Sequence, residues 1–225
     1  MDYSLLFGDR ADRVRALFGR TPLPTMAERW SIFPPVWAGG LVDSPAVAFI
    51  FINPTLRNQS AREHWNGDRA PFIGIRRPWK FLASCGLLDP RLVEVLPNDQ
   101  TWDASVAMHL YSHVARQKLY VTNLVKSCRD DSVMPSLAEA RGFLSLLAAE
   151  LQIVAPQVVV PMGGMVASLL TGRQVSLGEA LEHLRRNGSP YVAGRFADAE
   201  VVPSYFPVGR GSPTKAREIL TELSL

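Results

Sequence analysis

The chain has 225 residues, of which 47% are hydrophobic and 20% charged, and its formal net charge at pH 7 is +3. This length suffices for one large domain with a substantial core, and the composition is that of a globular protein rather than a disordered one. No apolar run approaches the ~20 residues of a membrane-spanning helix. The small net charge is by itself only weak evidence for nucleic-acid binding.

The beginning of the chain and its two cysteines indicate where the protein works. Residues 1–4 carry no basic region ahead of the first apolar pair, so we expect no signal peptide. Residues 1–45 are expected to form an entry segment, with an amphipathic helix over 9–20, packed on the main body. Cys85 and Cys128 have no metal-ligand spacing and are expected to be reduced thiols in a cytoplasmic protein.

From residue 46 onward, short apolar runs alternate with helical patterns. The four predicted strands span residues 46–52, 119–122, 158–160 and 200–202. Helices are predicted over 79–85, 103–114, 136–153, 165–170 and 177–186, and from Pro213 onward. This alternation indicates βα units with parallel strands. We therefore expect the α/β class: a three-layer α/β/α sandwich around a mainly parallel sheet of about four strands, in a single domain over residues 1–225.

Polar segments follow the predicted strand ends, which is where α/β proteins bind ligands. Asn53-Pro54 follows the first strand and Asn123 the second, and a loop with Pro71-Phe72 lies between them. An amide beside an aromatic ring suits a nucleobase, because the amide binds the base edge and the ring stacks on its face. Basic residues near these ends either contact phosphate or remain solvated; they are Lys126, Arg210, Lys215, Arg76 and Arg77.

The order of these motifs resembles the uracil-DNA glycosylase superfamily over residues 36–218. Its mismatch-specific and single-strand-selective branches carry Ile- or Met-Asn-Pro-Gly, then Pro-Phe, then Phe-Trp. The corresponding segments here are Ile52-Asn53-Pro54-Thr55, Pro71-Phe72 and Trp79-Lys80. The iron–sulfur branches carry Asn-Val-Val-Lys after the second strand, which is Asn123-Leu124-Val125-Lys126 here. The cysteines of those branches are absent, so no cluster, metal or other cofactor is expected.

The resemblance implies a role for each matching residue. Asn53 would orient the attacking water, Phe72 and Pro54 would contact the flipped base, and Asn123 would bind its edge. Phe206 occupies the position of a His or Asn that helps to stabilise the leaving base. The implied contacts with DNA come from Arg210, Gly211, Ser212, Lys126, Lys215, Arg76 and Arg77.

The resemblance implies a monofunctional, base-excision DNA glycosylase that flips and hydrolytically removes uracil or a related damaged base. The expected partner is DNA with a damaged base, with the preference for single or double strands left open; no membrane contact is expected, and the protein is expected to act as a monomer. Because Phe206 has no side-chain donor, weak activity is expected. Two alternatives stay open: a nucleic-acid-binding homologue that has lost catalysis, and an enzyme acting on free nucleosides or nucleotides.

Each candidate residue also has an ordinary structural explanation. Asn53 and Asn123 could be turn formers, and Phe72 could be a core residue. His64 could replace the missing donor, although a solvated loop histidine is the simpler interpretation.

Overall fold

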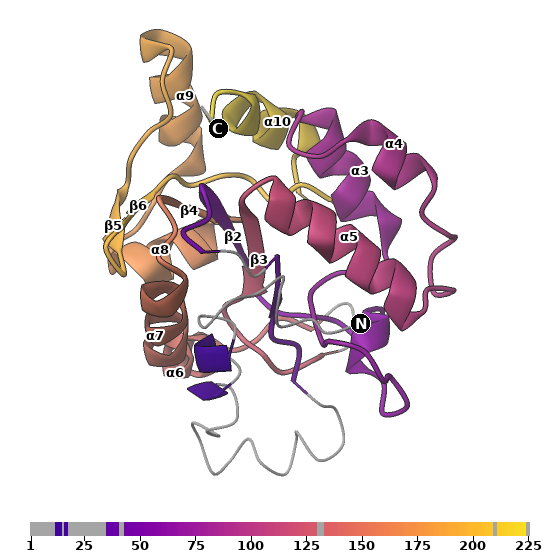
Figure 1. The fold of residues 1–225 in the computed structure, drawn as a ribbon. Coiled ribbons are helices and arrows are strands. Elements are labelled where there is room, and N and C mark those ends of the chain that lie inside the picture. The colour runs from indigo at the N-terminus through magenta and orange to yellow at the C-terminus, as the bar shows by residue number, and fades with distance from the viewer. Residues whose placement is uncertain are drawn as a thin grey trace.

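The computed structural model describes residues 12–14, 16–17, 35–40, 43–129, 133–208 and 211–223. Within these ranges the strands form one six-stranded sheet with the order β1-β3-β2-β4-β6-β5 (Figure 1). The strands are β1 (Ala38–Gly39), β2 (Val47–Phe51), β3 (Leu119–Asn123), β4 (Val158–Pro161), β5 (Gly194–Phe196) and β6 (Ala199–Val201).

The four strands predicted from the sequence form the parallel centre of this sheet. β2 pairs with β3 and β4, and β4 pairs with β6, all in parallel. β1 and β5 are short antiparallel strands at the two edges, next to β3 and β6 respectively. The prediction of a mainly parallel α/β sheet is thus confirmed, and the two additional strands are too short to give a hydrophobic pattern of their own.

The helices agree with the predicted ones apart from an additional short helix, α4, and one break. They are α3 (Arg76–Ser84), α4 (Pro90–Glu94), α5 (Ala104–Arg116), α6 (Leu137–Gly142), α7 (Leu144–Val154), α8 (Gly164–Thr171), α9 (Leu177–Asn187) and α10 (Pro213–Thr221), with a 3₁₀ turn η1 at Gln59–Ala61. Asp103, Ser136 and Ser176 cap α5, α6 and α9, since their side chains accept backbone N–H groups. The helix predicted over 136–153 is divided between Gly142 and Leu144, where glycine has low helix propensity and Phe143 is completely buried.

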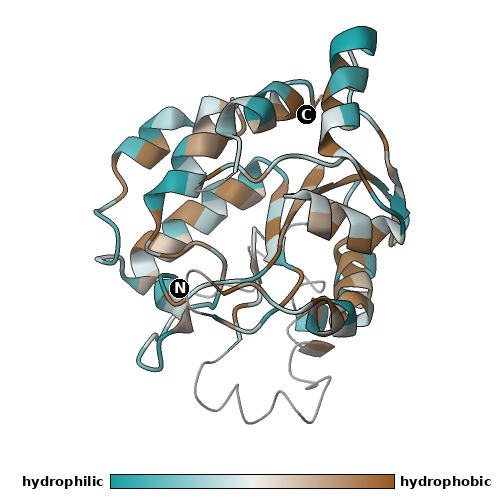
Figure 2. Ribbon diagram, turned by 180° about the vertical axis from the view of Figure 1, so that it is seen from behind, coloured by the Kyte–Doolittle hydropathy of each residue, from teal (hydrophilic) through white to brown (hydrophobic). Residues whose placement is uncertain are grey.

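Helices cover both faces of the sheet and create two cores (Figure 1). On the α5 face, residues of α3, α4, α5, α9 and α10 pack against Phe49, Phe51 and Val121. On the α7 face, residues of α6, α7 and α8 pack against Ile50 and Tyr120. Consecutive strand residues therefore alternate between the cores, and the covering helices carry both hydrophobic and hydrophilic residues (Figure 2).

The carboxyl ends of the central strands stay aligned beyond the strands themselves. The amide of Leu124 donates to the carbonyl of Phe51 over 2.7 Å, and the amide of Met162 donates to that of Ile50 over 2.9 Å. Gly163 N likewise donates to Ser204 O over 2.8 Å. The segments that follow β2, β3, β4 and β6 consequently leave the sheet at one edge, which we call the carboxyl edge.

Two expectations fall largely beyond the described ranges. Most of the entry segment 1–45 lies outside them, although residues 12–14, 16 and 17 are helical and Val14 is buried in the core of the α7 face. Arg210 also lies outside the described residues. Among those that are described, no helix is both long enough and apolar enough to cross a membrane.

Candidate functional site

Asn123, the last residue of β3, carries a buried side-chain amide. It is 1% exposed, and neither its Oδ1 nor its Nδ2 has a hydrogen-bond partner among the described residues. In the parallel register it lies opposite Phe51 of β2. Buried polar groups are nearly always paired, so an amide with two unused ends needs an explanation. It can both accept a hydrogen bond from a ligand and donate one to it.

Aromatic rings from three separate segments meet at Phe51. The ring centroid of Phe72 lies 4.6 Å from that of Phe51 with an interplanar angle of 83°, and that of Phe206 lies 6.0 Å away at 85°. Phe72 and Phe206 are both half-buried at the carboxyl edge. The structure thus brings three predicted site residues together around Phe51; we call Phe51, Phe72, Asn123 and Phe206 the tip cluster.

The loop that carries Phe72 is fixed at two consecutive carbonyls. The Tyr111 hydroxyl of α5 donates to the carbonyl of Pro71, and Trp79 Nε1 of α3 donates to that of Phe72 over 3.1 Å. Burial raises the pKa of the Tyr111 hydroxyl well above its usual value, so it stays a donor. Phe72 has φ = +59°, a conformation that a bulky residue adopts only when its surroundings impose it. Sequence reasoning missed Tyr111, whose only signal is a hydroxyl within a hydrophobic helix face.

Asn53 lies two residues beyond Phe51 on the same chain segment. It is half-buried, and its Nδ2 donates to the carbonyl of Pro54 over 2.9 Å. The amide of Val125 donates to the carbonyl of Ile52 over 2.9 Å, which holds the segments after β2 and β3 side by side. Asn53 and Asn123 are therefore at the same edge of the sheet.

Backbone hydrogen bonds join Gly211 and Ser212 to residues that follow β6. Ser212 N donates to Phe206 O over 3.0 Å, and Gly211 N donates to Val208 O over 3.1 Å. A Cβ at Gly211 would lie 1.8 Å from Phe206 O, so only glycine allows this approach. Ser212 directly precedes α10, whose first turn has free N–H groups that suit an anion.

Lys126 corrects one expectation, because its ammonium does not reach the surface. The residue is completely buried, and Nζ lies 2.6 Å from Glu150 Oε2. Burial lowers the pKa of Lys126, while the neighbouring Glu150 carboxylate acts to raise it. Lys126 therefore forms an internal ion pair instead of contacting phosphate, because the chain turns into the α7 face directly after the β3 tip.

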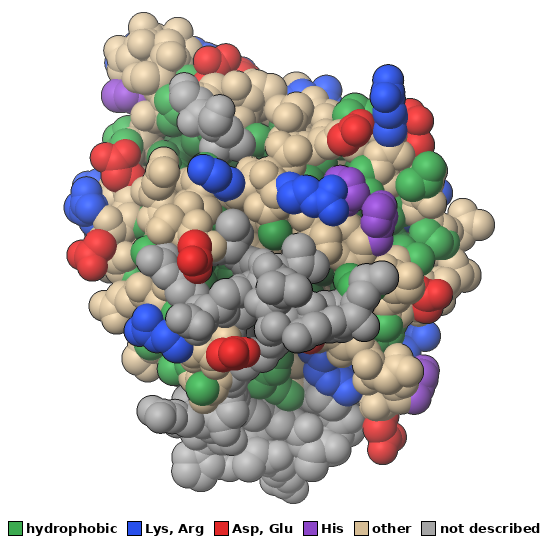
Figure 3. Space-filling view, in the orientation of Figure 1, with side chains coloured by type: hydrophobic (Ala, Val, Ile, Leu, Met, Phe, Trp, Pro, Cys, Tyr) green, Lys and Arg blue, Asp and Glu red, His purple; other side chains and the backbone are tan. Residues whose placement is uncertain are grey.

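The other basic candidates divide into internal and exposed groups. Arg76 is half-buried and donates to the carbonyls of Val93 and Glu94, at the end of α4, over 3.3 and 3.4 Å. This contact ties α3 to α4, which departs from the expected phosphate role. Arg77 and Lys215 are exposed, and Lys215 Nζ lies 5.2 Å from the ring centroid of Tyr205. On the face seen in Figure 3, basic and acidic side chains are interspersed rather than separated into patches.

No group of three or more His, Cys, Asp or Glu side chains that could hold a metal ion occurs within the described ranges.

A search among curated proteins found no match. A family model described as "Uracil DNA glycosylase superfamily" matches residues 40–223, which include five of the six strands of the sheet, all but β1. Members of this superfamily are generally hydrolytic glycosylases. The matched region holds the whole tip cluster and most of the chain, and the protein belongs to the uracil DNA glycosylase superfamily.

Proposed function

We propose that this protein is a monofunctional DNA glycosylase that binds a flipped uracil, or a closely related damaged pyrimidine, and hydrolyses its N-glycosidic bond. In this proposal the chain acts as a single domain and as a monomer. It uses its own side chains and a water molecule, without a metal or other cofactor.

The observation that carries this proposal is the unpaired amide of Asn123. Uracil presents an acceptor, O4, next to a donor, N3–H. Asn123 Nδ2 can donate to the first and Oδ1 can accept from the second, so one base satisfies both unused ends. The rings of Phe72 and Phe206 both lie against Phe51, the strand partner of Asn123, and can contact the faces of a flat heterocycle. The amide thus fits a base with an acceptor beside an N–H donor, as in uracil, and the rings fit a flat heterocycle.

The reaction needs a water oxygen at C1′ of the sugar and a departing base. As the bond from C1′ to N1 of the base breaks, the sugar becomes cationic, the base leaves as an anion that takes up a proton, and water supplies the new C1′ oxygen. In the proposed mechanism Asn53 orients the water, which lowers the entropic cost of the attack. Asn123 Nδ2 donates to O4 and so spreads the charge of the departing base. Phe206 has no donor to add, so we expect a slow reaction.

Release of uracil tests this proposal. Oligonucleotides with one uracil, single-stranded or opposite guanine, would be incubated with the native protein and with Asn53→Ala and Asn123→Ala variants. We expect slow formation of an abasic site with the native protein and none with either variant. Release that is equal in all three proteins, or no release above that of protein-free DNA, would contradict the proposal. Release from free deoxyuridine alone would indicate a nucleoside hydrolase instead.

One observation favours a second candidate, a binding protein without catalysis. The side chain at the position of the leaving-base donor is the ring of Phe206, which packs edge-on against Phe51. Such a protein would bind uracil-containing DNA more tightly than a thymine control, in an Asn123-dependent manner, without releasing the base. Binding measured by fluorescence anisotropy alongside the release assay separates the two candidates.

A further inference from the structure

Four polar side chains are completely buried on the α7 face, next to the tip of β3. Lys126 Nζ lies 2.6 Å from Glu150 Oε2 and donates to Thr122 Oγ1 over 2.6 Å. The Tyr120 hydroxyl donates to Glu150 Oε1 over 2.7 Å. We call Tyr120, Thr122, Lys126 and Glu150 the Lys126 network; each of them is 0% exposed.

A network of this kind is a poor source of net stability. Removing a lysine and a glutamate from water costs free energy that their attraction only partly returns, and hydrophobic replacements of buried ion pairs are often neutral or stabilising. The pair does restrict geometry, because each charge must stay close to the other.

The network holds the backbone on both sides of Asn123. Thr122 directly precedes it, and Lys126 follows three residues later. Thr122 Oγ1 also donates to the carbonyl of Trp37 over 3.1 Å, and the carbonyl of Lys126 accepts the amide of Val36 over 3.0 Å. The segment 122–126 is consequently attached to α7 through Glu150 and to the chain that leads into β1.

The Asn123 side chain depends on this support, because it has no hydrogen bonds that could fix its own direction. Neighbouring strand residues point to opposite faces of a sheet. Anchoring Thr122 in the α7 face therefore directs Asn123 toward the α5 face, where Phe51 lies. A shift or twist of segment 122–126 would move the amide without breaking a hydrogen bond of its own.

We propose that Lys126 and Glu150 are positioning residues that aim the Asn123 amide at the edge of a bound base and thereby set the preference for uracil. The identity of the ligand rests on the proposed function, whereas the aiming of Asn123 is independent of it. Neither Lys126 nor Glu150 touches the base in this proposal.

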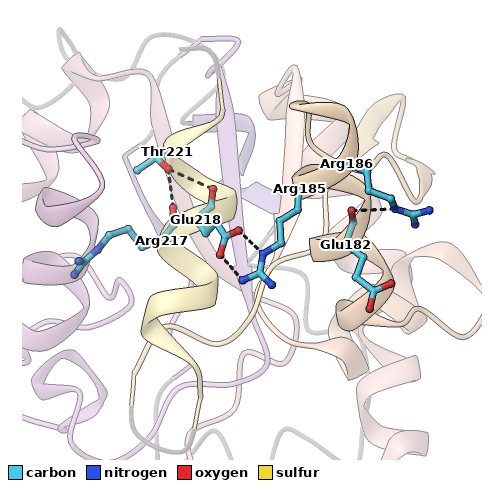
Figure 4. Close-up of polar contacts among 6 residues, drawn as sticks. All are labelled: Glu182, Arg185, Arg186, Arg217, Glu218 and Thr221. Atoms are coloured by element: carbon cyan, nitrogen blue, oxygen red, sulfur yellow. Dashed lines mark hydrogen bonds and ion pairs between the residues drawn. The ribbon is translucent and has the colours of Figure 1, made fainter.

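The first test measures the position of Asn123 directly. Lys126→Met leaves a buried carboxylate alone and risks misfolding, so the double variant Lys126→Met/Glu150→Leu is made beside it. The matched control is Arg185→Met/Glu218→Leu, which removes an exposed ion pair between α9 and α10, with 2.6 Å between Arg185 Nε and Glu218 Oε1 (Figure 4). Side-chain amide signals in ¹⁵N–¹H NMR spectra should shift or broaden for Asn123 in the Lys126 variants only. The amide of Asn58, buried but bonded to Ala70 O over 2.8 Å, is the internal reference and should not change.

The second test compares uracil with 3-methyluracil, which lacks the N3–H donor. The native protein should bind uracil about fivefold more tightly, as one well-placed hydrogen bond contributes on the order of 1 kcal/mol. The double variant should lose this preference while its affinity for 3-methyluracil stays the same, and the control should keep it. If the double variant has a lower melting temperature but native Asn123 signals and the native preference, the positioning role is wrong. If the native protein shows no preference and the Asn123 signals still respond to Lys126, the proposed function fails while the positioning role is supported.

Discussion

Phe51 and Asn123 are direct partners in the parallel register of β2 and β3, and together they carry the two kinds of group that bind a flat base. Phe51 is the ring on which Phe72 and Phe206 converge, and Asn123 has a carboxamide with both ends unused. The sheet thus places a polar group within an apolar environment. This arrangement favours ligand binding at the expense of the free energy of folding.

The substitution Asn123→Leu should therefore stabilise the protein while abolishing its function. A buried amide without partners costs about 1–3 kcal/mol, and leucine has a similar shape without that cost. We expect the free energy of unfolding, measured in urea, to rise by about 1–2 kcal/mol, and uracil release to disappear.

Asn58→Leu is the matched control for this prediction. Asn58 is equally buried, but its Nδ2 donates to Ala70 O and its Oδ1 accepts the hydroxyl and the amide of Ser60. Its replacement should destabilise the protein by about 1–3 kcal/mol, because those partners are left unpaired. If both leucine variants destabilise equally, Asn123 has a partner in solution and is not poised for a ligand.

The sequence predicted the carboxyl edge well because parallel strands end at a common edge. Asn53, Asn123 and Phe206 each follow a strand that local pattern identifies, and the loop between the first two strands supplies Phe72. These four residues could thus be grouped without coordinates. The edge strands β1 and β5, of two and three residues, are too short to show a period.

Long-range pairing explains what the sequence could not predict. Lys126 follows a strand end, where a lysine is ordinarily solvated, and its partner Glu150 is on a helix 24 residues later. Arg76 likewise bonds to carbonyls of α4, a helix of five residues that the sequence pattern did not indicate. Tyr111 contacts the Phe72 loop 40 residues away. Each of these contacts depends on how helices are placed against the sheet.

Binding to DNA should weaken with salt, with separable contributions from individual side chains. Each phosphate contact adds about 0.7–0.9 to the slope of log affinity against log salt concentration. Lys215→Ala and Arg77→Ala should each lower the slope by about that amount, since both side chains are exposed on helices that begin after the site segments. Reversing the charge at Arg210 should weaken binding for all sequences.

Lys118→Ala serves as the control for the salt series. Lys118 is exposed but precedes β3, at the amino edge of the sheet, so its replacement should leave the slope unchanged. Arg76→Ala should mainly reduce stability, because its guanidinium binds the end of α4. A slope that responds to Lys118 as strongly as to Lys215 would place DNA elsewhere on the protein.

Cys128 should be unreactive in the folded protein and should make stability fall at alkaline pH. Burial raises the pKa of this thiol from 9.0 to about 12, although the Arg69 guanidinium acts to lower it. At pH 8 the thiolate fraction, and with it the rate of alkylation, should be roughly a thousandfold below that of an ordinary cysteine. Mass spectrometry after iodoacetamide treatment, with and without urea, measures this protection.

The raised pKa of Cys128 also determines the sign of the pH dependence of stability. The folded protein keeps the thiol proton up to a higher pH than the unfolded chain, so the free energy of unfolding should fall as pH rises from 9.0 toward 12. In the Cys128→Ala variant the free energy of unfolding should fall less steeply with pH. The buried hydroxyls of Tyr111 and Tyr120, whose pKa values are also raised, should retain part of the slope in this variant. An identical slope in the native protein and the variant would show that Cys128 is solvated.

Restoring a donor at Phe206 should accelerate the reaction. Phe206→His and Phe206→Asn place an N–H group where the native ring meets Phe51, close to the position implied for the departing base. Removing one such donor from an evolved site costs about 10²–10³ in turnover. A newly introduced donor in unrefined geometry should recover on the order of tenfold. Phe206→Leu, which also replaces the ring by a smaller side chain but adds no donor, is the matched control and should show no gain.

The gain should appear in the single-turnover rate rather than in affinity for DNA. The departing base carries negative charge only in the transition state, so a new donor stabilises that state more than the bound substrate. Tighter binding with an unchanged rate would mean that the donor contacts the uncharged base instead. The alternative donors are His64, which is exposed, and Arg210, and their alanine variants are measured in parallel. If Phe206→His has the native rate while His64→Ala or Arg210→Ala slows the reaction, the donor is already supplied from that residue. If every variant, Phe206→His included, releases the base only as fast as protein-free DNA does, the non-catalytic binding protein is favoured. Restoring a donor would then have no reaction to accelerate.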